Sequence, residues 1–177
     1  MRVLVDATTL IALGQVGELD LLAWLDGELV VPETARAEVS TEPARTNVQS
    51  HSDCVRRCEW DSPGQRNMLF ARAKQTLGED TENGDVAIVA SVLRWSDLEG
   101  RDVGVVSDDR RVRTVARGLG ATVTGTVGVI VRAVEERGTT AEEGKELVRR
   151  VDSHGLHMTG ELREKAYELV AEAAENE

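Results

Sequence analysis

The chain opens with an apolar run that ends at an aspartate, and this feature constrains the fold more than any other. Residues 3–5 are apolar, Asp6 follows, and a second apolar, helix-like run occupies residues 7–13. An apolar run that opens a chain is typical of a core strand. A carboxylate at the end of such a strand costs free energy unless something pairs with it. Asp6 therefore predicts that other residues meet it, either directly or through a metal ion that they hold in common.

Length and composition place the chain among globular proteins. Its 177 residues suit one domain with a sizeable core, and a hydrophobic content of 41% excludes a disordered chain. No apolar run reaches the roughly 18 residues that a membrane span needs, and the first residues lack the pattern of a signal peptide. We expect a soluble, cytoplasmic protein without a membrane partner.

The charged residues are unusual in kind as well as in balance. The net charge is −11, with 32 acidic residues against 21 basic ones, and only Lys74, Lys145 and Lys165 are lysines. A surface rich in carboxylates and poor in lysine suits a cell interior of high salt, where charges are screened, and favours a halophilic archaeon as the source. An ordinary acidic protein from a GC-rich genome is the alternative. The acidity argues against a broad basic patch for nucleic acid but is compatible with a local arginine cluster.

Apolar runs alternate with helical patterns along the chain. Strands are predicted at residues 2–6, 28–31, 103–106 and 121–124. Helices are predicted at 8–16, 18–25, 32–40, near 46–57, and at 63–77, 85–93, 110–117, 126–137, 140–150 and 160–175. This alternation is typical of an α/β layer fold with a parallel sheet. We expect an α/β domain over residues 1–138 and a helical C-terminal extension over 139–177.

Acidic residues recur where predicted elements begin or end. Asp6 ends the first strand, Asp108 and Asp109 follow the third, and Glu38 and Asp85 lie on helices that can pack against the same edge. Sites in parallel sheets lie beyond the carboxyl ends of the strands. An all-oxygen cluster suits a hard cation such as Mg²⁺ or Mn²⁺, which can activate water for hydrolysis of nucleic acid.

Each of these carboxylates also has a simpler interpretation. With 32 acidic residues, several fall near strand ends by chance. Glu38 alone could be a solvated helix residue, Asp85 a charge at a helix N-terminus, and Asp108 or Asp109 an N-cap. Asp6 is the hardest to explain in this way, because it interrupts an apolar stretch. Spacing alone leaves a metal site and a chance arrangement about equally open.

Four segments each combine an apolar stretch with an acidic residue. They are Val3 to Leu13 with Asp6 and Thr8, Val31 to Val39 with Pro32 and Glu38, Gly84 to Ala90 with Asp85, and Val105 to Arg110 with Ser107 and Asp109. In this order they resemble the segments of PIN-domain proteins, a family of metal-dependent ribonucleases that includes the VapC-type toxins of toxin–antitoxin pairs. The similarity covers roughly residues 2–135. It is greatest to a branch of uncharacterised prokaryotic PIN proteins described as nucleic-acid-binding.

The resemblance implies a three-layer α/β/α fold with a central parallel sheet and a set of catalytic roles. Asp6, Glu38, Asp85 and Asp109 would bind one or two Mg²⁺ or Mn²⁺ ions that activate water for attack on an RNA phosphodiester. Asp108, adjacent to the fourth position, is the competing ligand. Thr8 and Ser107 would orient carboxylates or water. Arg110, Arg111 and Arg113 would contact phosphate, and their simpler interpretation is a solvated helix face.

The resemblance also implies partners, and it leaves rival functions open. A homodimer is the expectation for the family, and a toxin would have an antitoxin protein as partner. One rival is a non-catalytic PIN-like module that binds nucleic acid or a protein. Another is a nuclease with a housekeeping role in RNA processing. In the C-terminal extension, an apolar stripe at helical spacing is predicted to pack on the domain or on a second copy; its members are Leu162, Ala166, Leu169, Val170 and Ala173.

Overall fold

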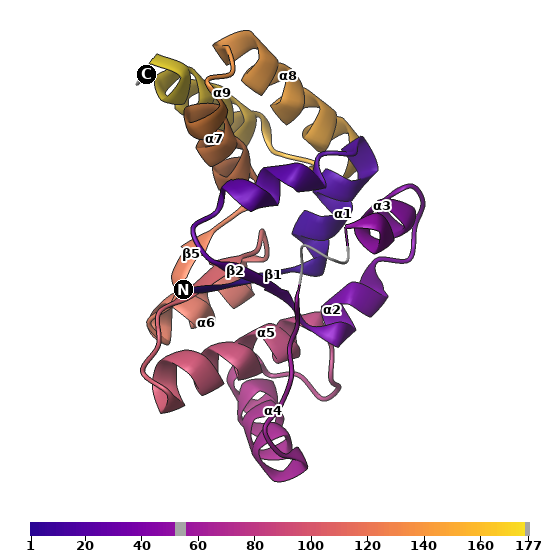
Figure 1. Cartoon of the computed structure of the whole chain (residues 1–177), viewed down its shortest axis with the longest axis vertical. Helices are drawn as coiled ribbons and strands as arrows, with labels where there is room; N and C mark the ends of the chain where they lie inside the picture. Colours follow the sequence, from indigo (N-terminus) through magenta and orange to yellow (C-terminus); the bar gives the residue numbers. More distant parts are fainter. Residues whose placement is uncertain (52–55, 176–177) are drawn as a thin grey trace.

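A parallel β-sheet runs through the middle of the molecule, with helices on both of its faces (Figure 1). The computed structural model describes residues 1–51 and 56–175. Five strands pair in the order β3-β2-β1-β4-β5, all parallel. They are β1 (Arg2–Val5), β2 (Glu28–Val31), β3 (Arg56–Arg57), β4 (Val103–Val106) and β5 (Thr122–Thr124). The predicted three-layer α/β/α fold with a central parallel sheet is confirmed.

Helices make up most of the remaining chain. The α-helices are α1 (Ala7–Val16), α2 (Glu33–Glu38), α3 (Ala44–Ser50), α4 (Pro63–Leu77), α5 (Gly84–Val92), α6 (Arg110–Gly118), α7 (Thr126–Arg137), α8 (Ala141–Val151) and α9 (Gly160–Glu175). Shorter helical turns are η1 (Leu19–Trp24), η3 (Leu93–Leu98) and η4 (Asp152–Leu156). Among the described residues, none of these helices combines the length and apolar character needed to cross a membrane.

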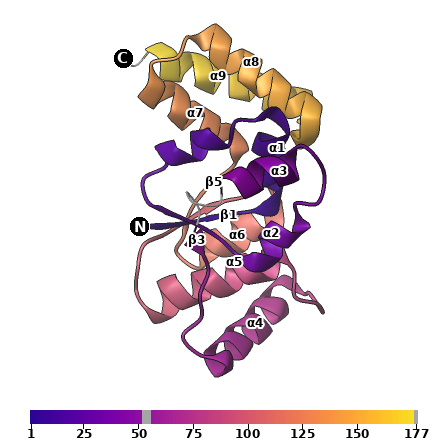
Figure 2. The same ribbon diagram turned by 45° about the vertical axis from the view of Figure 1, so that its right-hand side comes forward.

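The alternation of side chains along β1 divides the core into two layers. Val3 and Val5 pack in a cluster with α1, α7, α8 and α9, whereas Leu4 packs with α5 and α6 on the other face. Successive residues of a strand point to opposite faces, so a wholly apolar strand must be covered on both sides. Figure 2 shows the two helical layers above and below the sheet.

Helix α5 is buried between the sheet and α4. Ile88 and Val92 belong to the cluster with Leu4, whereas Val86 and Val89 pack with residues of α4. A helix that is apolar nearly all round is expected to be buried, as the sequence predicts for residues 85–93. Packed in this way, α5 has its N-terminus at the edge of the sheet.

The segment between α2 and α4 differs from the prediction. The helix expected near 46–57 is α3, which ends at Ser50, and Arg56–Arg57 pair with β2 as a short edge strand, so the C-terminal part of the predicted helix is wrong. Residues 52–55 lie outside the part of the chain that the structure describes. Pairing with β2 depends on contacts distant in sequence, and two residues are too few to show a strand pattern.

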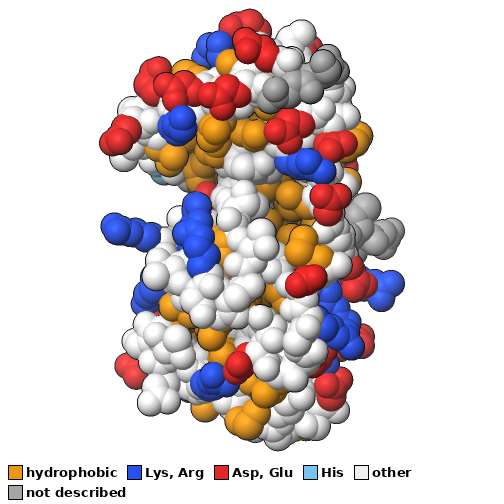
Figure 3. All heavy atoms as spheres, turned by 90° about the vertical axis from the view of Figure 1, so that its left-hand side faces the viewer, with side chains coloured by type: hydrophobic (Ala, Val, Ile, Leu, Met, Phe, Trp, Pro, Cys, Tyr) orange, Lys and Arg blue, Asp and Glu red, His pale blue; other side chains and the backbone are white. Residues whose placement is uncertain are grey.

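The C-terminal helices pack into the same core as the sheet. Val148 of α8 and Val170 of α9 are fully buried in the cluster that contains Val3. At Gly144 in α8 an added Cβ would overlap Val170 and approach Val134 Cγ2 of α7 to 2.9 Å, so a glycine allows the three helices to meet. The helices on the two sides of residue 138 pack against each other. The domain boundary expected at that residue stays a prediction. Figure 3 shows acidic side chains gathered over this end of the molecule.

Candidate active site

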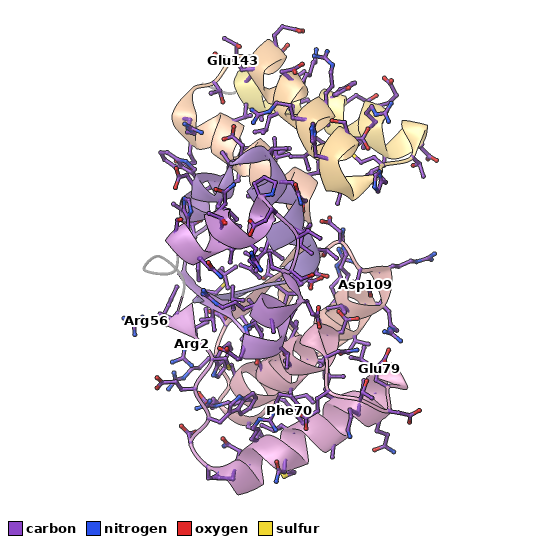
Figure 4. All side chains as sticks on the ribbon, turned by 90° about the vertical axis from the view of Figure 1, so that its right-hand side faces the viewer. Arg2, Arg56, Phe70, Glu79, Asp109 and Glu143 are labelled. Carbon is purple, nitrogen blue, oxygen red and sulfur yellow. The ribbon has the colours of Figure 1, made fainter. Side chains whose placement is uncertain are left out.

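At the carboxyl edge of the sheet one hydroxyl group joins the carboxylate of Asp6 to the backbone of Asp109. Strands β1 and β4 are neighbours, with Val5 paired to Val106, so Asp6 and Ser107 emerge side by side. Ser107 Oγ donates to Asp6 Oδ2 at 2.7 Å and accepts from the backbone N–H of Asp109 at 3.1 Å. In Figure 4 Asp109 lies on the opposite side of the molecule from Arg2, which starts β1.

Asp6 is a buried carboxylate that does not cap the helix that follows it. Its residue is 2% exposed, and Thr8 Oγ1 donates to the same Oδ2 at 2.9 Å. Asp6 occupies the N-cap position of α1, yet its side chain makes no capping hydrogen bond. Two hydroxyl groups therefore hold the charge in place, and capping does not explain why an aspartate ends this strand.

The structure separates the two neighbouring aspartates after β4. Asp109 caps α6, because its Oδ1 accepts from Val112 N at 2.8 Å. Asp108 turns toward the start of α7, where Oδ1 accepts from Thr126 N at 3.0 Å and Oδ2 accepts from the Thr126 hydroxyl. Both oxygens of Asp108 are thus engaged with Thr126, whereas Asp109 uses only one.

Glu38 reaches the start of α5 from the end of α2. Its Oε1 accepts from the backbone N–H of Gly84 at 2.7 Å. A Cβ at position 84 would lie 2.9 and 3.1 Å from the Glu38 oxygens and 3.2 Å from Ala35 Cα. Such approaches are closer than van der Waals contact, so a side chain at position 84 would push the Glu38 carboxylate out of its present place. A negative charge at this N-terminus also interacts favourably with the helix dipole.

Asp85 follows Gly84 in the chain, and its surroundings disfavour the ionised form of its carboxyl group. Burial, together with the nearby charges of Asp6 and Asp109, raises the pKa of its carboxyl group to about 6. Arg111 opposes this shift, with Nη2 3.5 Å from Asp85 Oδ2. Asp6 and Asp109 therefore both repel Asp85, although the three residues come from the end of β1, the segment after β4 and the first turn of α5. A bound cation would relieve that repulsion.

The raised pKa of Asp85 predicts a pH-dependent gain in stability for Asp85→Asn. The folded state holds this proton up to a pH of about 6, whereas the unfolded chain releases it near 3.8. Stability is therefore lost as the pH rises from about 4 through 6. In a metal chelator, Asp85→Asn should be more stable than the wild type by about 1–2 kcal/mol at pH 7.5, after allowance for partial exposure. Urea denaturation at several pH values measures this gain.

The exposed Asp80 provides the matched control for that experiment. Asp80→Asn removes the same charge from the adjacent acidic connection and should leave stability within about 0.5 kcal/mol at each pH. The gain from Asp85→Asn should disappear as the pH falls to 4. A gain that persists at pH 4, or one equal to that of Asp80→Asn, would contradict the electrostatic account.

The four carboxylates share a donor chemistry that suits a hard cation. In Asp6, Glu38, Asp85 and Asp109 one oxygen is hydrogen-bonded to the protein, and the described residues give no hydrogen bond to the other. An all-oxygen donor set is the kind that Mg²⁺ and Mn²⁺ prefer. Among the described residues, no group of three His, Cys, Asp or Glu side chains could hold a metal ion as it stands. Metal binding would therefore require these carboxylates to draw together.

The arginines that start α6 have different surroundings. Arg110 is exposed, and its guanidinium makes no ion pair with the part of the chain that the structure describes. Arg111 pairs with Glu79 at 2.5 Å and touches Asp85. Arg113 lies against Gly125, where an added Cβ would come within 2.9 Å of its Nη1. Glu79 was not among the predicted site residues, and its acidic surroundings in the sequence contain no signal that would have identified it.

The comparisons with known proteins identify the family. A family model described as a PIN domain matches residues 2–172, which extends the similarity beyond residue 135 and through most of α9. No curated protein and no solved structure matches the chain. PIN domains have a nuclease-type fold, and the central parallel sheet flanked by helices agrees with this match. The chain belongs to the PIN-domain family.

Proposed function

We propose that this protein is a Mg²⁺- or Mn²⁺-dependent endoribonuclease that hydrolyses RNA phosphodiester bonds, with Asp6, Glu38, Asp85 and Asp109 as metal ligands. The observation that carries the proposal is the convergence at the carboxyl edge. Ser107 links Asp6 to Asp109, and both are close enough to Asp85 to raise the pKa of its carboxyl group. Membership of the PIN-domain family supports the reaction class.

The hydrogen bonds favour Asp109 over Asp108 as the fourth ligand. Both oxygens of Asp108 are bonded to Thr126, and this contact joins the end of β4 to α7. Asp109 is held by Val112 N through one oxygen, so the other is available for a cation. We therefore assign Asp108 a positioning role in this proposal.

The remaining contacts position the ligands. Thr8 and Ser107 fix Asp6 through Oδ2, and the Gly84 N–H fixes Glu38 through Oε1. Contacts of this kind orient ligands and raise metal affinity. The bound cation would supply the charge that activates water and stabilises the phosphodiester as negative charge develops on it. Arg110, whose guanidinium makes no ion pair with the described residues, would contact a phosphate of the RNA, and Arg111 and Arg113 lie on the same helix.

Cleavage of a labelled single-stranded RNA tests the proposal. Purified protein should cut the RNA with Mn²⁺ or Mg²⁺, lose activity in a metal chelator and regain it when metal is added back. A DNA strand of the same sequence tests whether the substrate is RNA. The first assays should be run at high salt, because the net charge of −11 makes folding sensitive to screening. Cleavage that persists in chelator, or cleavage of DNA alone, would contradict the proposal.

Gly84→Ala tests the position of Glu38. The new Cβ would displace the Glu38 carboxylate, because it would lie 2.9 Å from one of its oxygens. We expect cleavage to fall by about 10- to 100-fold, as for loss of other contacts that orient metal ligands. Gly64→Ala, at the start of α4 where an added Cβ meets no atom within 4 Å, is the matched control. Equal activity of the two variants would show that Glu38 does not need its present position.

One observation favours a second candidate function. No three acidic, histidine or cysteine side chains of the described residues form a ready metal group, which suits a non-catalytic module that binds nucleic acid or a protein. Calorimetry with Mn²⁺ separates the two functions, because the module would neither bind the metal nor cut RNA. The toxin role, the antitoxin partner and the homodimer stay predictions.

A further inference from the structure

Arg111 places a positive charge against one of the proposed metal ligands. It is the second residue of α6, and its Nη2 lies 3.5 Å from Asp85 Oδ2. That oxygen belongs to the carboxylate that Asp6 and Asp109 already repel. The guanidinium therefore partly neutralises a charge that a divalent ion would otherwise neutralise. A cation bound at Asp85 and the guanidinium would repel each other over this short distance.

Glu79 holds the same guanidinium more tightly than Asp85 does. Arg111 Nη2 lies 2.5 Å from Glu79 Oε1, and Nη1 donates to the carbonyl of Leu77 at 3.3 Å. Both partners lie where α4 ends and the acidic connection to α5 begins. Figure 4 shows Glu79 on the same side of the molecule as Asp109. The contact with Asp85 is the longest of the three, so it is the one that breaks at least cost.

We infer that Arg111 competes with the metal ion for Asp85 and that Glu79 weakens this competition by holding the guanidinium away from the site. This inference rests on the proposed function, since it assumes that Asp85 binds a metal. Arg111 is thus a positioning residue. Without Glu79 the guanidinium would turn fully to Asp85, and without Arg111 the carboxylate would be left to the cation alone.

Calorimetric titration with Mn²⁺ tests this competition without relying on catalysis. Arg111→Gln should lower the Kd for Mn²⁺ by about three- to fivefold, the range expected for a half-exposed ion pair. Glu79→Gln should raise it by about two- to threefold. Arg111→Lys keeps the charge and should stay within about twofold of the wild type. All titrations use one salt concentration at which thermal unfolding shows each variant to be folded.

Matched variants separate competition at Asp85 from a general change in charge. Arg117→Gln removes an exposed arginine from the last turn of α6, and Glu82→Gln removes the acid that pairs with Arg66. Both should leave the Kd within about twofold. In the Arg111→Gln background Glu79→Gln should have a smaller effect than in the wild type, because its partner is gone.

The outcomes distinguish this inference from the proposed function. If the wild type binds Mn²⁺ and Asp6→Asn weakens binding, but Arg111→Gln changes nothing or matches Arg117→Gln, the competition is overturned and the metal site is kept. If neither the wild type nor Arg111→Gln binds Mn²⁺, both are overturned. Binding that is detectable only in Arg111→Gln would support the inference directly.

Discussion

Asp6→Asn is expected to reduce metal-dependent RNA cleavage by about 100- to 1000-fold. A neutral amide keeps an oxygen that can accept from Ser107 and Thr8 but lacks the charge needed to hold a cation at the sheet edge. Losses of this size are typical when one electrostatic contact in an active site is removed. The measurement is the initial rate of cleavage of a labelled RNA at saturating Mn²⁺.

The thermal stability of Asp6→Asn shows whether the variant loses activity at the site or because it no longer folds. The substitution removes a buried charge, since Asp6 is 2% exposed, so the midpoint of thermal unfolding should not fall. Asp102→Asn is the matched control, because Asp102 is exposed just before β4, at the other end of the sheet, and should keep full activity. Cleavage by Asp6→Asn at the wild-type rate would contradict the proposed function, whatever the metal affinity.

Val170→Asp is expected to destabilise the whole protein by at least about 4 kcal/mol. Val170 is fully buried in α9, in the cluster that includes Val3 of β1 and Val148 of α8. A carboxylate placed there has no partner and would either remain uncompensated or unfold the layer. Urea denaturation followed by circular dichroism measures the loss.

Leu162→Asp is the matched control on the same helix. Leu162 belongs to the predicted apolar stripe but is 46% exposed, so the same substitution should change the free energy of unfolding by less than about 0.5 kcal/mol. A small effect of Val170→Asp would show that α9 is an appendage that can detach from the core. Two separate transitions in the variant would show that the chain unfolds as two cooperative units, as the expected domain boundary predicts.

The layers of the fold could be predicted because the central strands are marked by their own side chains. Val3, Leu4 and Val5 are apolar on both faces, which only a covered strand allows. The short strand β3 could not be predicted, because Arg56 and Arg57 acquire their extended conformation from pairing with β2. Nothing local distinguishes two arginines in an edge strand from two arginines in a helix.

The sequence names the candidate members of the site but not the contacts that these residues make. Asp6 was identifiable because it ends an apolar run, which is a local signal. The choice between Asp108 and Asp109 depends on Thr126, which lies 18 residues away in the sequence, so spacing could not decide it. The pairing of Arg111 with Glu79 likewise requires α4 and α6 to dock before the two side chains can meet.

The contact between Asp108 and Thr126 links the acidic edge of the sheet to the far end of the chain. Thr126 begins α7, its hydroxyl also lies 3.1 Å from the hydroxyl of Thr9 in α1, from which it can accept, and α7 packs against α8 and α9. Asp109 adjoins the anchored residue, so a shift of α7 along its axis would displace a proposed ligand. The C-terminal helices are therefore connected to the acidic edge by packing and by one hydrogen-bonded carboxylate, although Asp6, Glu38, Asp85 and Asp109 all precede α7 in the chain.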